Sequence, residues 1–364
     1  MKKILFITNS SLDNPRRGTP LRMLSVARQI AKEHKLVICT KDIADDVKAE
    51  FVAYPKGNAM QRFLFFKKLI KKHKVDIVLA HTEMEVRMPV FLKLFTGVKI
   101  VLDMHGLYAE EMYYHGLMNN RKRWLVDKVV RFFLRFYNML FICNLKHKQY
   151  YSHVANKMRL VYNGVESKFL EVQSNQEPEV FTIGYAGNLK PYQGFDYLLT
   201  ALAEIKKKKL FDFRLNFVLS SGTTHIEGML KEHNLLDNAD LHFKVPHGEV
   251  SKIITKSSVL VVPRPSLKMT EYAYPSKLPS DLLTGIPTIT TNVGPIEQLF
   301  KPADCCVVIA TDDIAKNLEQ ALVKVHGMNS QDRRDLGQRA VNFVKTTLSW
   351  DILGKDINKY LGEL

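Results

Sequence analysis

Two histidines follow short apolar runs that are typical of buried strands. His105 comes after the run 99–103, and His81 comes after the run 77–80. An imidazole at the carboxyl end of a strand can donate a hydrogen bond to a sugar hydroxyl or stabilise a developing positive charge. We expect this chemistry at His105. For His81 we expect packing in the core or support of another residue.

A third candidate for ligand chemistry is the loop 9–22 near the start of the chain. Thr19 suits the cap of a helix, and Pro20 suits its first position. Gly18 lets the backbone approach a ligand closely. The N-terminus of a helix attracts anions, so this loop could bind a phosphate or a sugar oxygen. The alternative is an ordinary connection between a strand and a helix.

Such residues need parallel strands to position them, and the chain alternates strand-like and helical segments in two series. The first series of strands is predicted at 4–8, 36–40, 77–80, 99–103, 140–143 and 160–162. The second is predicted at 182–185, 214–219, 240–243, 258–262, 288–291 and 307–310. This alternation predicts an α/β protein with two doubly wound domains, which bind ligands at the carboxyl ends of their strands.

Four motifs occur along the chain in a fixed order. They are Asn-Gly-Val at 163–165, Gly-Asn-Leu at 187–189, Pro-Ser-Lys-Leu at 275–278 and Gly-Ile-Pro-Thr-Ile at 285–289. Together they resemble the retaining glycosyltransferases of family 4, and the resemblance covers nearly the whole chain. It implies the GT-B fold, in which two Rossmann-like domains face each other across a cleft. The implied parts are an acceptor-binding domain at 1–170, a nucleotide-sugar-binding domain at 171–347 and a final helix at 348–364 that crosses back to the first domain.

The same resemblance implies roles for individual residues. His105 matches a histidine that touches the transferred sugar, and we treat it as the catalytic candidate. Arg22 matches an arginine after the first glycine loop, which we assign to acceptor binding. The donor-binding residues implied are Gly18, Gly187, Asn188, Lys190, Arg264, Glu271, Lys277, Leu278, Ser280 and Asp281.

The chain departs from the family pattern at positions that matter for the donor. Asn188 and Gln193 stand where the family has an arginine and a lysine that neutralise the diphosphate. Ser280 stands where an acid binds the ribose, with Asp281 next to it, and Glu271 is one position from the place of the other acid. The cations that could replace the missing charges are Lys190, Arg264 and Lys277.

Positive charge is concentrated in the first half of the chain. Residues 1–170 contain 31 Lys and Arg against 14 Asp and Glu, whereas the remaining residues contain 22 against 23. Two helical segments, 62–74 and 121–140, combine these cations with aromatic residues. In the second, one basic stripe flanked by aromatic side chains comprises Lys128, Arg131 and Arg135, with Phe132, Phe133, Phe136 and Tyr137. We expect these helices to contact an anionic membrane surface. The alternative is an outer helix of the fold with its charges in water.

Several other partners are not expected. The chain has no Asp-x-Asp motif and no Cys/His spacing typical of zinc, so we predict no metal and no cofactor. It shows no nucleic-acid module, so we predict no nucleic-acid partner. No apolar run is long enough to span a membrane, and Cys39, Cys143, Cys305 and Cys306 are expected to be buried thiols. We therefore expect a cytoplasmic protein at the inner face of the cell membrane.

The resemblance predicts a retaining, metal-independent glycosyltransferase of hexosyl type. Its donor would be a nucleotide-diphosphate sugar, with UDP preferred, and its acceptor a glycan or lipid-linked molecule in cell-surface polysaccharide synthesis. Two alternatives remain open. One is a non-catalytic partner subunit of the same fold, which the departures at the donor site favour. The other is a nucleotide-sugar epimerase, which would need acid/base carboxylates that the motifs do not show clearly.

Overall fold

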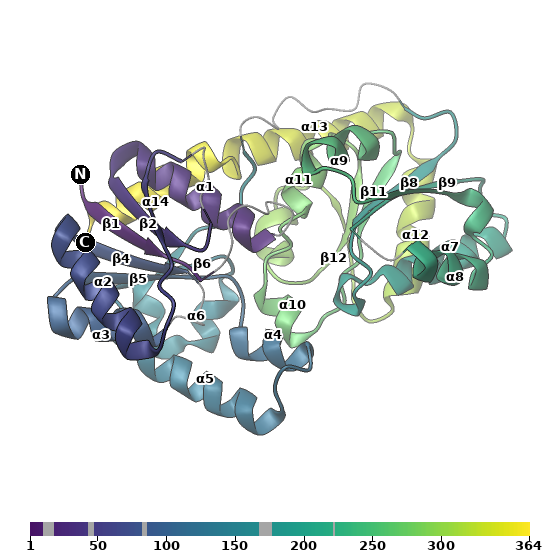
Figure 1. Ribbon diagram of the computed structural model, residues 1–364. Coiled ribbons are helices and arrows are strands. Elements are labelled where there is room, and N and C mark those ends of the chain that lie inside the picture. The colour runs from purple at the N-terminus through teal and green to yellow at the C-terminus, as the bar shows by residue number, and fades with distance from the viewer. Residues whose placement is uncertain (10–17, 43–46, 82–85, 167–176, 221–222) are drawn as a thin grey trace. The chain divides into compact units, whose positions relative to one another are not determined.

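The chain folds into two compact units, each with one parallel sheet and flanking helices (Figure 1). The computed structural model describes residues 1–9, 18–42, 47–81, 86–166, 177–220 and 223–364. Unit 1 comprises Met1–Glu166, Tyr272–Tyr274 and Ser349–Leu364, and unit 2 comprises Ser167–Glu271 and Pro275–Leu348. The predicted α/β class with two Rossmann-like sheets is confirmed. The assignment of Tyr272–Tyr274 to unit 1 was not foreseen.

The sheet of unit 1 has seven parallel strands in the order β3-β2-β1-β4-β5-β6-β7. The order changes direction between β1 and β4, and doubly wound sheets bind ligands at the carboxyl edge of this switch point. The strands are β1 (Lys3–Ile7), β2 (Lys35–Thr40), β3 (Glu50–Ala53), β4 (Ile77–His81), β5 (Lys99–Met104), β6 (Met139–Ile142) and β7 (Met158–Leu160). The sequence did not predict β3, because this edge strand is only half-buried and lacks a continuous apolar run.

Alternate residues of the strands in unit 1 bury against opposite layers of helices, as the period of a strand requires. Leu5 and Ile7 join the core formed with α2, α3 and α5, whereas Ile4 and Phe6 join the core formed with α1 and α14 (Figure 1). The helices are α1 (Gly18–Glu33), α2 (Ala59–His73), α3 (Arg87–Thr96), α4 (Tyr108–Tyr114), α5 (Asn120–Leu134), α6 (Lys146–Tyr150) and α14 (Trp350–Gly362), with a 3-10 turn at Ser152–Lys157.

The C-terminal helix α14 packs against α1 within unit 1. Its first residue, Trp350, is buried, and the Trp350 backbone N–H donates to the carbonyl of Val165 at 3.0 Å. Further along, the Asn358 side chain donates to the carbonyl of Gln29 at 3.0 Å. Burial of Trp350, Leu353, Ile357 and Leu361 in this core stabilises the packing of the helix. The last segment of the chain is therefore part of the core of unit 1.

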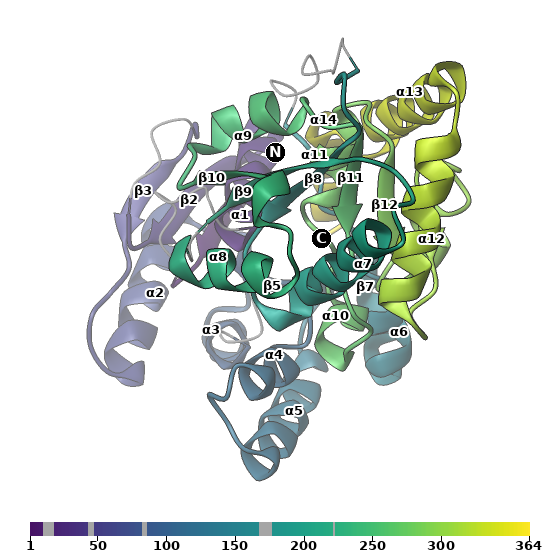
Figure 2. The ribbon, with the colours of Figure 1, turned by 90° about the vertical axis from the view of Figure 1, so that its right-hand side faces the viewer.

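Unit 2 has a six-stranded parallel sheet in the order β10-β9-β8-β11-β12-β13, with its switch point between β8 and β11. The strands are β8 (Thr182–Gly187), β9 (Arg214–Leu219), β10 (Ala239–Phe243), β11 (Val259–Val262), β12 (Thr288–Thr291) and β13 (Val307–Ile309). The helices are α7 (Phe195–Lys207), α8 (Thr223–Glu232), α9 (His247–Ile254), α10 (Lys268–Tyr272), α11 (Leu278–Leu283), α12 (Ile314–Gly327) and α13 (Ser330–Thr347), with short turns at Pro191–Gln193, Leu236–Asn238 and Ile296–Phe300. Figure 2 shows α7, α8 and α12 together on one side of this sheet, and α9 packs on the other.

Two further sequence predictions can be compared with the fold. All four cysteines are buried and none forms a disulfide, as expected. Within the described parts of the chain, no helix has the length and apolar character needed to cross a bilayer.

Candidate active site

The predicted histidine His105 lies at the carboxyl edge of the sheet in unit 1. It follows β5 directly, while His81 is the last residue of β4. The pairing of β4 with β5 places His81 opposite Asp103. Arg22 reaches the same point from α1, 81 residues before Asp103 in the chain. We call these four residues, Arg22, His81, Asp103 and His105, the histidine cluster.

A buried ion pair forms the base of the histidine cluster. Arg22 Nη2 lies 2.7 Å from Asp103 Oδ1, and Arg22 Nε donates to Asp103 Oδ2 at 3.1 Å. Burial by itself would raise the pKa of Asp103, but the neighbouring guanidinium and the two imidazoles outweigh it and hold this pKa well below its usual range. Asp103 is therefore ionised at neutral pH. The sequence analysis gave Asp103 no role, although a charge within the apolar run 99–103 is an unusual feature.

The two imidazoles lie side by side above this pair. His81 Nδ1 is 3.2 Å from Asp103 Oδ2 and 3.4 Å from His105 Nε2. His105 Nε2 is 3.6 Å from the same carboxylate oxygen. Burial is the largest influence on both histidines and lowers the pKa of each, so both are neutral at pH 7. His81 is fully buried, whereas the side chain of His105 is 16% exposed and can meet a ligand.

The possible ligand atoms of His81, Asp103 and His105 lie within 4.8 Å of one another, which is close enough to hold a metal ion. Both oxygens of Asp103, however, already accept hydrogen bonds from Arg22. A divalent cation here would lie next to the guanidinium and be repelled by it at low dielectric. The arrangement therefore suits a hydrogen-bonded network better than a metal centre.

Arg22 occupies a different position from the one expected of an acceptor-binding residue. Its Nη1 donates to the carbonyls of Val161 at 3.0 Å and Tyr162 at 3.1 Å, and to Asn163 Oδ1 at 2.8 Å. The Arg22 side chain is 1% exposed. Its guanidinium thus fastens α1 to Asp103 and to the Asn-Gly-Val turn, and this geometry offers no support for direct contact with an acceptor. Gly18 is the first residue of α1, and the preceding loop residues 10–17 lie outside the described ranges.

A second group of polar residues lies at the carboxyl edge of unit 2, at the switch point between β8 and β11. Lys277, just before α11, donates to the carbonyl of Ala186, and its ammonium lies 4.8 Å from the ring centre of Tyr185. A Cβ at Gly187 would lie 2.4 Å from this ammonium nitrogen and 2.8 Å from Tyr185 Oη, so a larger residue there would require both side chains to shift. Arg264 follows β11 and its charge acts on Lys277. We call Arg264, Lys277 and Asp281 the lysine site.

Two groups of the lysine site, Lys277 and Asp281, titrate close to neutral pH. Burial lowers the pKa of Lys277 to about 8, with the attraction of Asp281 opposing it and the repulsion of Arg264 adding to it. Burial also raises the pKa of Asp281 to about 7 against the attraction of Lys277. Perturbed pKa values of this kind are common where proteins bind charged ligands. The site can therefore present a net positive charge to an anion at pH 7.

The other predicted donor-binding residues surround this group or lie inside the unit. Asn188 Oδ1 accepts from the backbone of Lys190 at 3.0 Å, and the Lys190 side chain is exposed. Glu271 accepts from Ser266 Oγ at 2.5 Å and from the Gly294 backbone N–H at 3.4 Å. Ser280 is exposed beside Asp281. Leu278 is completely buried, so its part is to pack α11 against unit 2.

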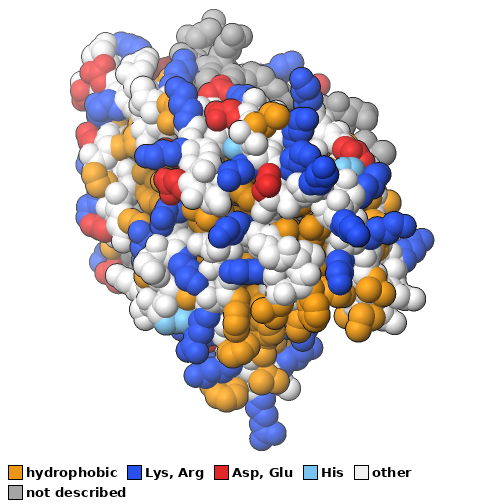
Figure 3. Space-filling model, turned by 90° about the vertical axis from the view of Figure 1, so that its left-hand side faces the viewer, with side chains coloured by type: hydrophobic (Ala, Val, Ile, Leu, Met, Phe, Trp, Pro, Cys, Tyr) orange, Lys and Arg blue, Asp and Glu red, His pale blue; other side chains and the backbone are white. Residues whose placement is uncertain are grey.

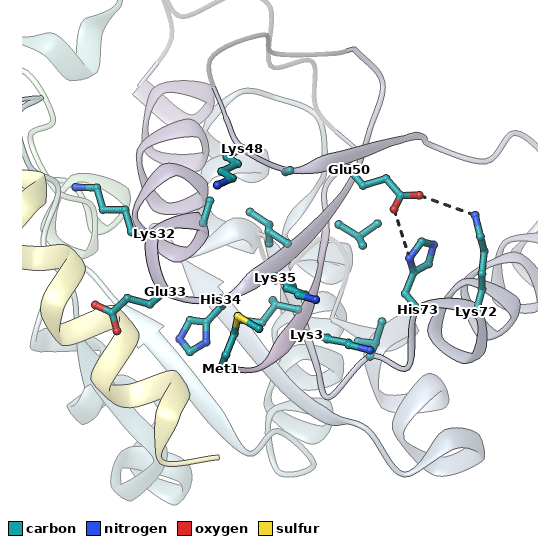
Figure 4. Close-up of a pocket in the computed structure, with 16 residues that line it drawn as sticks. Met1, Lys3, Lys32, Glu33, His34, Lys35, Lys48, Glu50, Lys72 and His73 are labelled. Atoms are coloured by element: carbon teal, nitrogen blue, oxygen red, sulfur yellow. Dashed lines mark ion pairs between the residues drawn. The ribbon is translucent and has the colours of Figure 1, made fainter.

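A hollow of about 750 Å³ lies at the opposite edge of the unit 1 sheet, at the amino ends of β1, β2 and β3 (Figure 4). Lys3 and Lys35 stand opposite each other in the β1–β2 pairing, and His73 faces Glu50 at 3.5 Å. None of the predicted site residues lines this hollow. Because ligands of doubly wound sheets bind at the carboxyl edge, we take the histidine cluster as the candidate site of unit 1 and the lysine site as the candidate site of unit 2.

A basic, aromatic surface covers part of unit 1, but its composition differs from the predicted stripe. Arg131 pairs with Asp127 at 2.7 Å and lies over the ring of Tyr150, and Tyr137 is buried. The sequence pattern did not predict the contribution of α3. We call the exposed apolar residues of α2, α3 and α5, together with Phe136 just after α5, the aromatic face (Figure 3): Met60, Leu64, Phe91, Leu94, Phe95, Trp124, Leu125, Phe132 and Phe136.

Comparison with known families places both halves of the chain. Residues 17–169 match the family described as Glycosyltransferase Family 4. Residues 167–342 match the family described as Glycosyl transferases group 1. Both units are therefore similar to parts of one kind of enzyme. No curated protein sequence matches the chain.

Solved structures share the fold at low sequence identity. Sucrose-phosphate synthase from Thermosynechococcus elongatus is 15% identical with a TM-score of 0.80, and the match covers 100% of this chain and 99% of that one. HepE from Anabaena, solved with UDP-glucose, is 12% identical with a TM-score of 0.77 over 100% of both chains. WaaG, described as a glycosyltransferase involved in lipopolysaccharide biosynthesis, is 16% identical with a TM-score of 0.69 over 99% of this chain and 100% of that one. At these identities the likeness concerns the fold.

Proposed function

We propose, from the premise that the chain belongs to the GT-B glycosyltransferases of family 4 type, that it is a retaining hexosyltransferase. Its donor is a nucleotide-diphosphate sugar, with UDP as the first candidate. Its acceptor is a glycan or lipid-linked molecule in cell-surface polysaccharide synthesis. The crystallised complex of HepE with UDP-glucose supports the choice of donor, and the role of WaaG in lipopolysaccharide biosynthesis supports the choice of pathway class.

The observation that carries this proposal is the lysine site at the switch point of unit 2. When the glycosidic bond to the donor breaks, negative charge develops on the departing diphosphate, and fixed cations lower the energy of that state. Arg264 and Lys277 stand at the carboxyl edge where a diphosphate binds in doubly wound sheets. They supply the charge that Asn188 and Gln193 cannot, and no metal ion is required in this scheme.

The remaining roles follow from the chemistry of each group. The ribose of the nucleotide carries hydroxyl groups that donate hydrogen bonds. Asp281 or the exposed Ser280 provides the oxygen atom that accepts these hydrogen bonds. His105, which is neutral and partly exposed, contacts a hydroxyl of the transferred sugar. Arg22 keeps the loop around His105 in place through Asp103 and the Asn-Gly-Val turn.

Calorimetric titration with UDP, GDP and ADP tests the donor assignment. We expect one nucleotide to bind the wild-type protein and the Lys277→Met variant to bind it at least tenfold more weakly, because a charged hydrogen bond of about 1.5–3 kcal/mol is lost. Lys324→Met, which removes an exposed lysine from α12, is the matched control and should bind like wild type. Equal affinities for the two variants would refute the role of Lys277.

The alternative is a non-catalytic partner subunit, which the substitutions at Asn188, Gln193 and Ser280 favour. The contacts of Lys277 with Ala186 and Tyr185 also favour it, because they occupy the ammonium group in the absence of a ligand. A donor-hydrolysis screen across nucleotide sugars separates the two. Release of nucleotide from one donor supports the enzyme, whereas no release and no nucleotide binding support the partner subunit.

We further propose that the aromatic face binds an anionic membrane, so that the protein works at the inner surface of the cell membrane. Eight large apolar side chains on α2, α3 and α5 are exposed, as is Phe136 just after α5, and clustered exposed apolar side chains mark interaction surfaces. The aromatic contacts of Phe63 with Phe95 and of Phe91 with Phe133 link these helices into one surface. Exposed cations surround it, and each contributes about 1 kcal/mol near anionic lipid. They are Lys67, Lys68, Arg87, Lys122, Lys128 and Arg135.

Tryptophan fluorescence offers a direct test of the membrane proposal, because the chain has two tryptophans and they differ in exposure. Trp124 on the aromatic face is 62% exposed and Trp350 is 2% exposed. Vesicles of phosphatidylglycerol should shift the emission of Trp124 to shorter wavelength, and phosphatidylcholine vesicles or high salt should not.

Substitutions on the aromatic face test the same proposal by vesicle flotation. Replacing both Leu94 and Phe95 by Gln should abolish co-flotation with phosphatidylglycerol vesicles, because the apolar contact is lost. Val323→Gln, which changes an exposed apolar residue of α12, should leave flotation unchanged. Equal recovery with neutral and anionic vesicles, or a purified dimer joined through this face, would contradict the proposal.

A further inference from the structure

The proposed function uses His105 but leaves His81 unexplained. His81 is 1% exposed and cannot meet a ligand. Its Nδ1 faces both Asp103 Oδ2 and His105 Nε2, at 3.2 and 3.4 Å. Its Nε2 is buried and has no hydrogen-bond partner among the described residues. One ring nitrogen of His81 is therefore part of a hydrogen-bond network, and the other is buried without a partner. Such burial costs folding free energy, so it needs an explanation.

The contacts of His81 determine which of its nitrogens carries the proton. Asp103 is ionised by its pairing with Arg22, so its oxygens can only accept. His81 is neutral and carries one N–H, which must be on Nδ1 to donate to Asp103 Oδ2. The unpartnered Nε2 is then a bare nitrogen. This assignment also costs least, because a buried N–H without a partner is rarer in proteins than an unsatisfied acceptor.

The tautomer of His81 in turn determines that of His105. If His105 carried its proton on Nε2, two N–H groups would face each other across 3.4 Å. Asp103 Oδ2 lies 3.6 Å from that nitrogen, beyond normal hydrogen-bond length. A bare Nε2 on His105 avoids this repulsion and shares the proton of His81. Its single proton therefore lies on Nδ1.

We infer that His81, held by Asp103 and Arg22, is a positioning residue that keeps His105 in the Nδ1–H tautomer. His105 then presents a hydrogen-bond donor to a hydroxyl oxygen of the bound sugar and cannot act there as a base. A histidine side chain free in water favours the Nε2–H tautomer, so the network imposes the other one. The sugar contact rests on the proposed function, but the tautomer itself does not.

The tautomer is measurable without any activity. In the full-length protein labelled with [15N]histidine, two-bond 1H–15N correlation spectra at pH 7 should show His105 and His81 with a protonated Nδ1 and a bare Nε2. Signals are assigned by their loss in the His105→Gln and His81→Leu variants. A wild-type His105 with its proton on Nε2 would overturn the inference.

Substitution of His81 tests the direction of the effect. In His81→Leu, we expect His105 to change to the Nε2–H tautomer, because Asp103 Oδ2 loses the competing donor. In His81→Asn the side-chain amide can replace the N–H of Nδ1, so His105 should keep its original tautomer. His153→Leu, an exposed histidine in unit 1, is the control and should leave the signals of His105 unchanged. A His105 that is unaffected by His81→Leu would also overturn the inference.

Kinetics then separates this inference from the proposed function. With an active donor and acceptor pair, His81→Leu should lower kcat about fivefold through loss of one hydrogen bond in the transition state, with little change in KM, and His81→Asn should restore most of it. If the spectra agree and no transfer occurs with any donor, the proposed function fails while the tautomer stands. If transfer occurs and the spectra disagree, the inference fails alone.

Discussion

Removal of the Arg22 guanidinium should destabilise unit 1 far more than removal of an exposed charge from the same helix. In Arg22→Met the carboxylate of Asp103 stays buried without its partner, and three oxygens of the 161–163 turn lose a donor. Breaking a buried ion pair from one side costs about 3–5 kcal/mol. Lys32→Met, also on α1, breaks the pair with Asp351, which is about half exposed on both sides. Although that pair is as short, at 2.6 Å, its loss should cost about 0–1 kcal/mol.

The loss in Arg22→Met should depend on pH in a specific direction. In the wild type the pKa of Asp103 is low, so its stabilising contribution is present above the unfolded value and persists from pH 7 to pH 5. Without Arg22, burial dominates and raises this pKa above the unfolded value. A carboxyl group with a raised pKa lowers the free energy of unfolding as pH rises through its folded pKa. Acidification of Arg22→Met should therefore restore part of the lost stability. The difference from wild type should shrink by about 1–2 kcal/mol between pH 7 and pH 5.

Urea denaturation followed by tryptophan fluorescence measures these values. Both tryptophans, Trp124 and Trp350, belong to unit 1, and only Trp350 is buried, so the change in emission reports the unfolding of this unit. Equal losses in Arg22→Met and Lys32→Met would refute the reasoning about burial. An unchanged difference between pH 7 and pH 5 would refute the assignment of the cost to an unpaired Asp103.

Three further outcomes follow from other parts of the structure. Ile357→Ala, in the buried face of α14, should lower the stability of unit 1 by about 2–5 kcal/mol in the same fluorescence experiment, and a smaller loss would mean that the helix adds little to the core. Gly337→Ala on α13 should destabilise unit 2 by about 1–3 kcal/mol in calorimetry, because the new methyl group would overlap the carbonyl of Gly285. Gly228→Ala on α8 meets open space and should stabilise unit 2 by about 0.5–1 kcal/mol, because alanine favours the helix more than glycine does. Nucleotide affinity should fall from pH 7 to pH 9 as Lys277 loses its proton near pH 8, and calorimetry should find this dependence weakened in Lys277→Met.

Local sequence patterns were sufficient for most of the elements. The strands β9 and β12 have the predicted bounds, and most others differ by one or two residues at an end. Apolar, β-branched runs bounded by polar turns are local signals, and they do not depend on the rest of the chain. The same signals located His105 after a strand, whereas Lys277 and Asp281 were indicated by the family motifs. The family motifs were sufficient to predict the fold, which both sheets confirm.

The tertiary structure decided which of these residues meet. Arg22 was assigned to acceptor binding from the family motif, because sequence spacing does not reveal its partner, and the fold brings it to Asp103. The edge strand β3 has no strong pattern of its own and is held by pairing with β2. Helical periodicity likewise does not show which apolar residues are buried by another element. The exposure of Phe91, Leu94 and Phe95 on α3 is visible only in the folded chain. Burial and pairing between distant segments are properties of the packed chain, and for this reason the sequence alone determined the elements and their chemistry but not the network that positions His105.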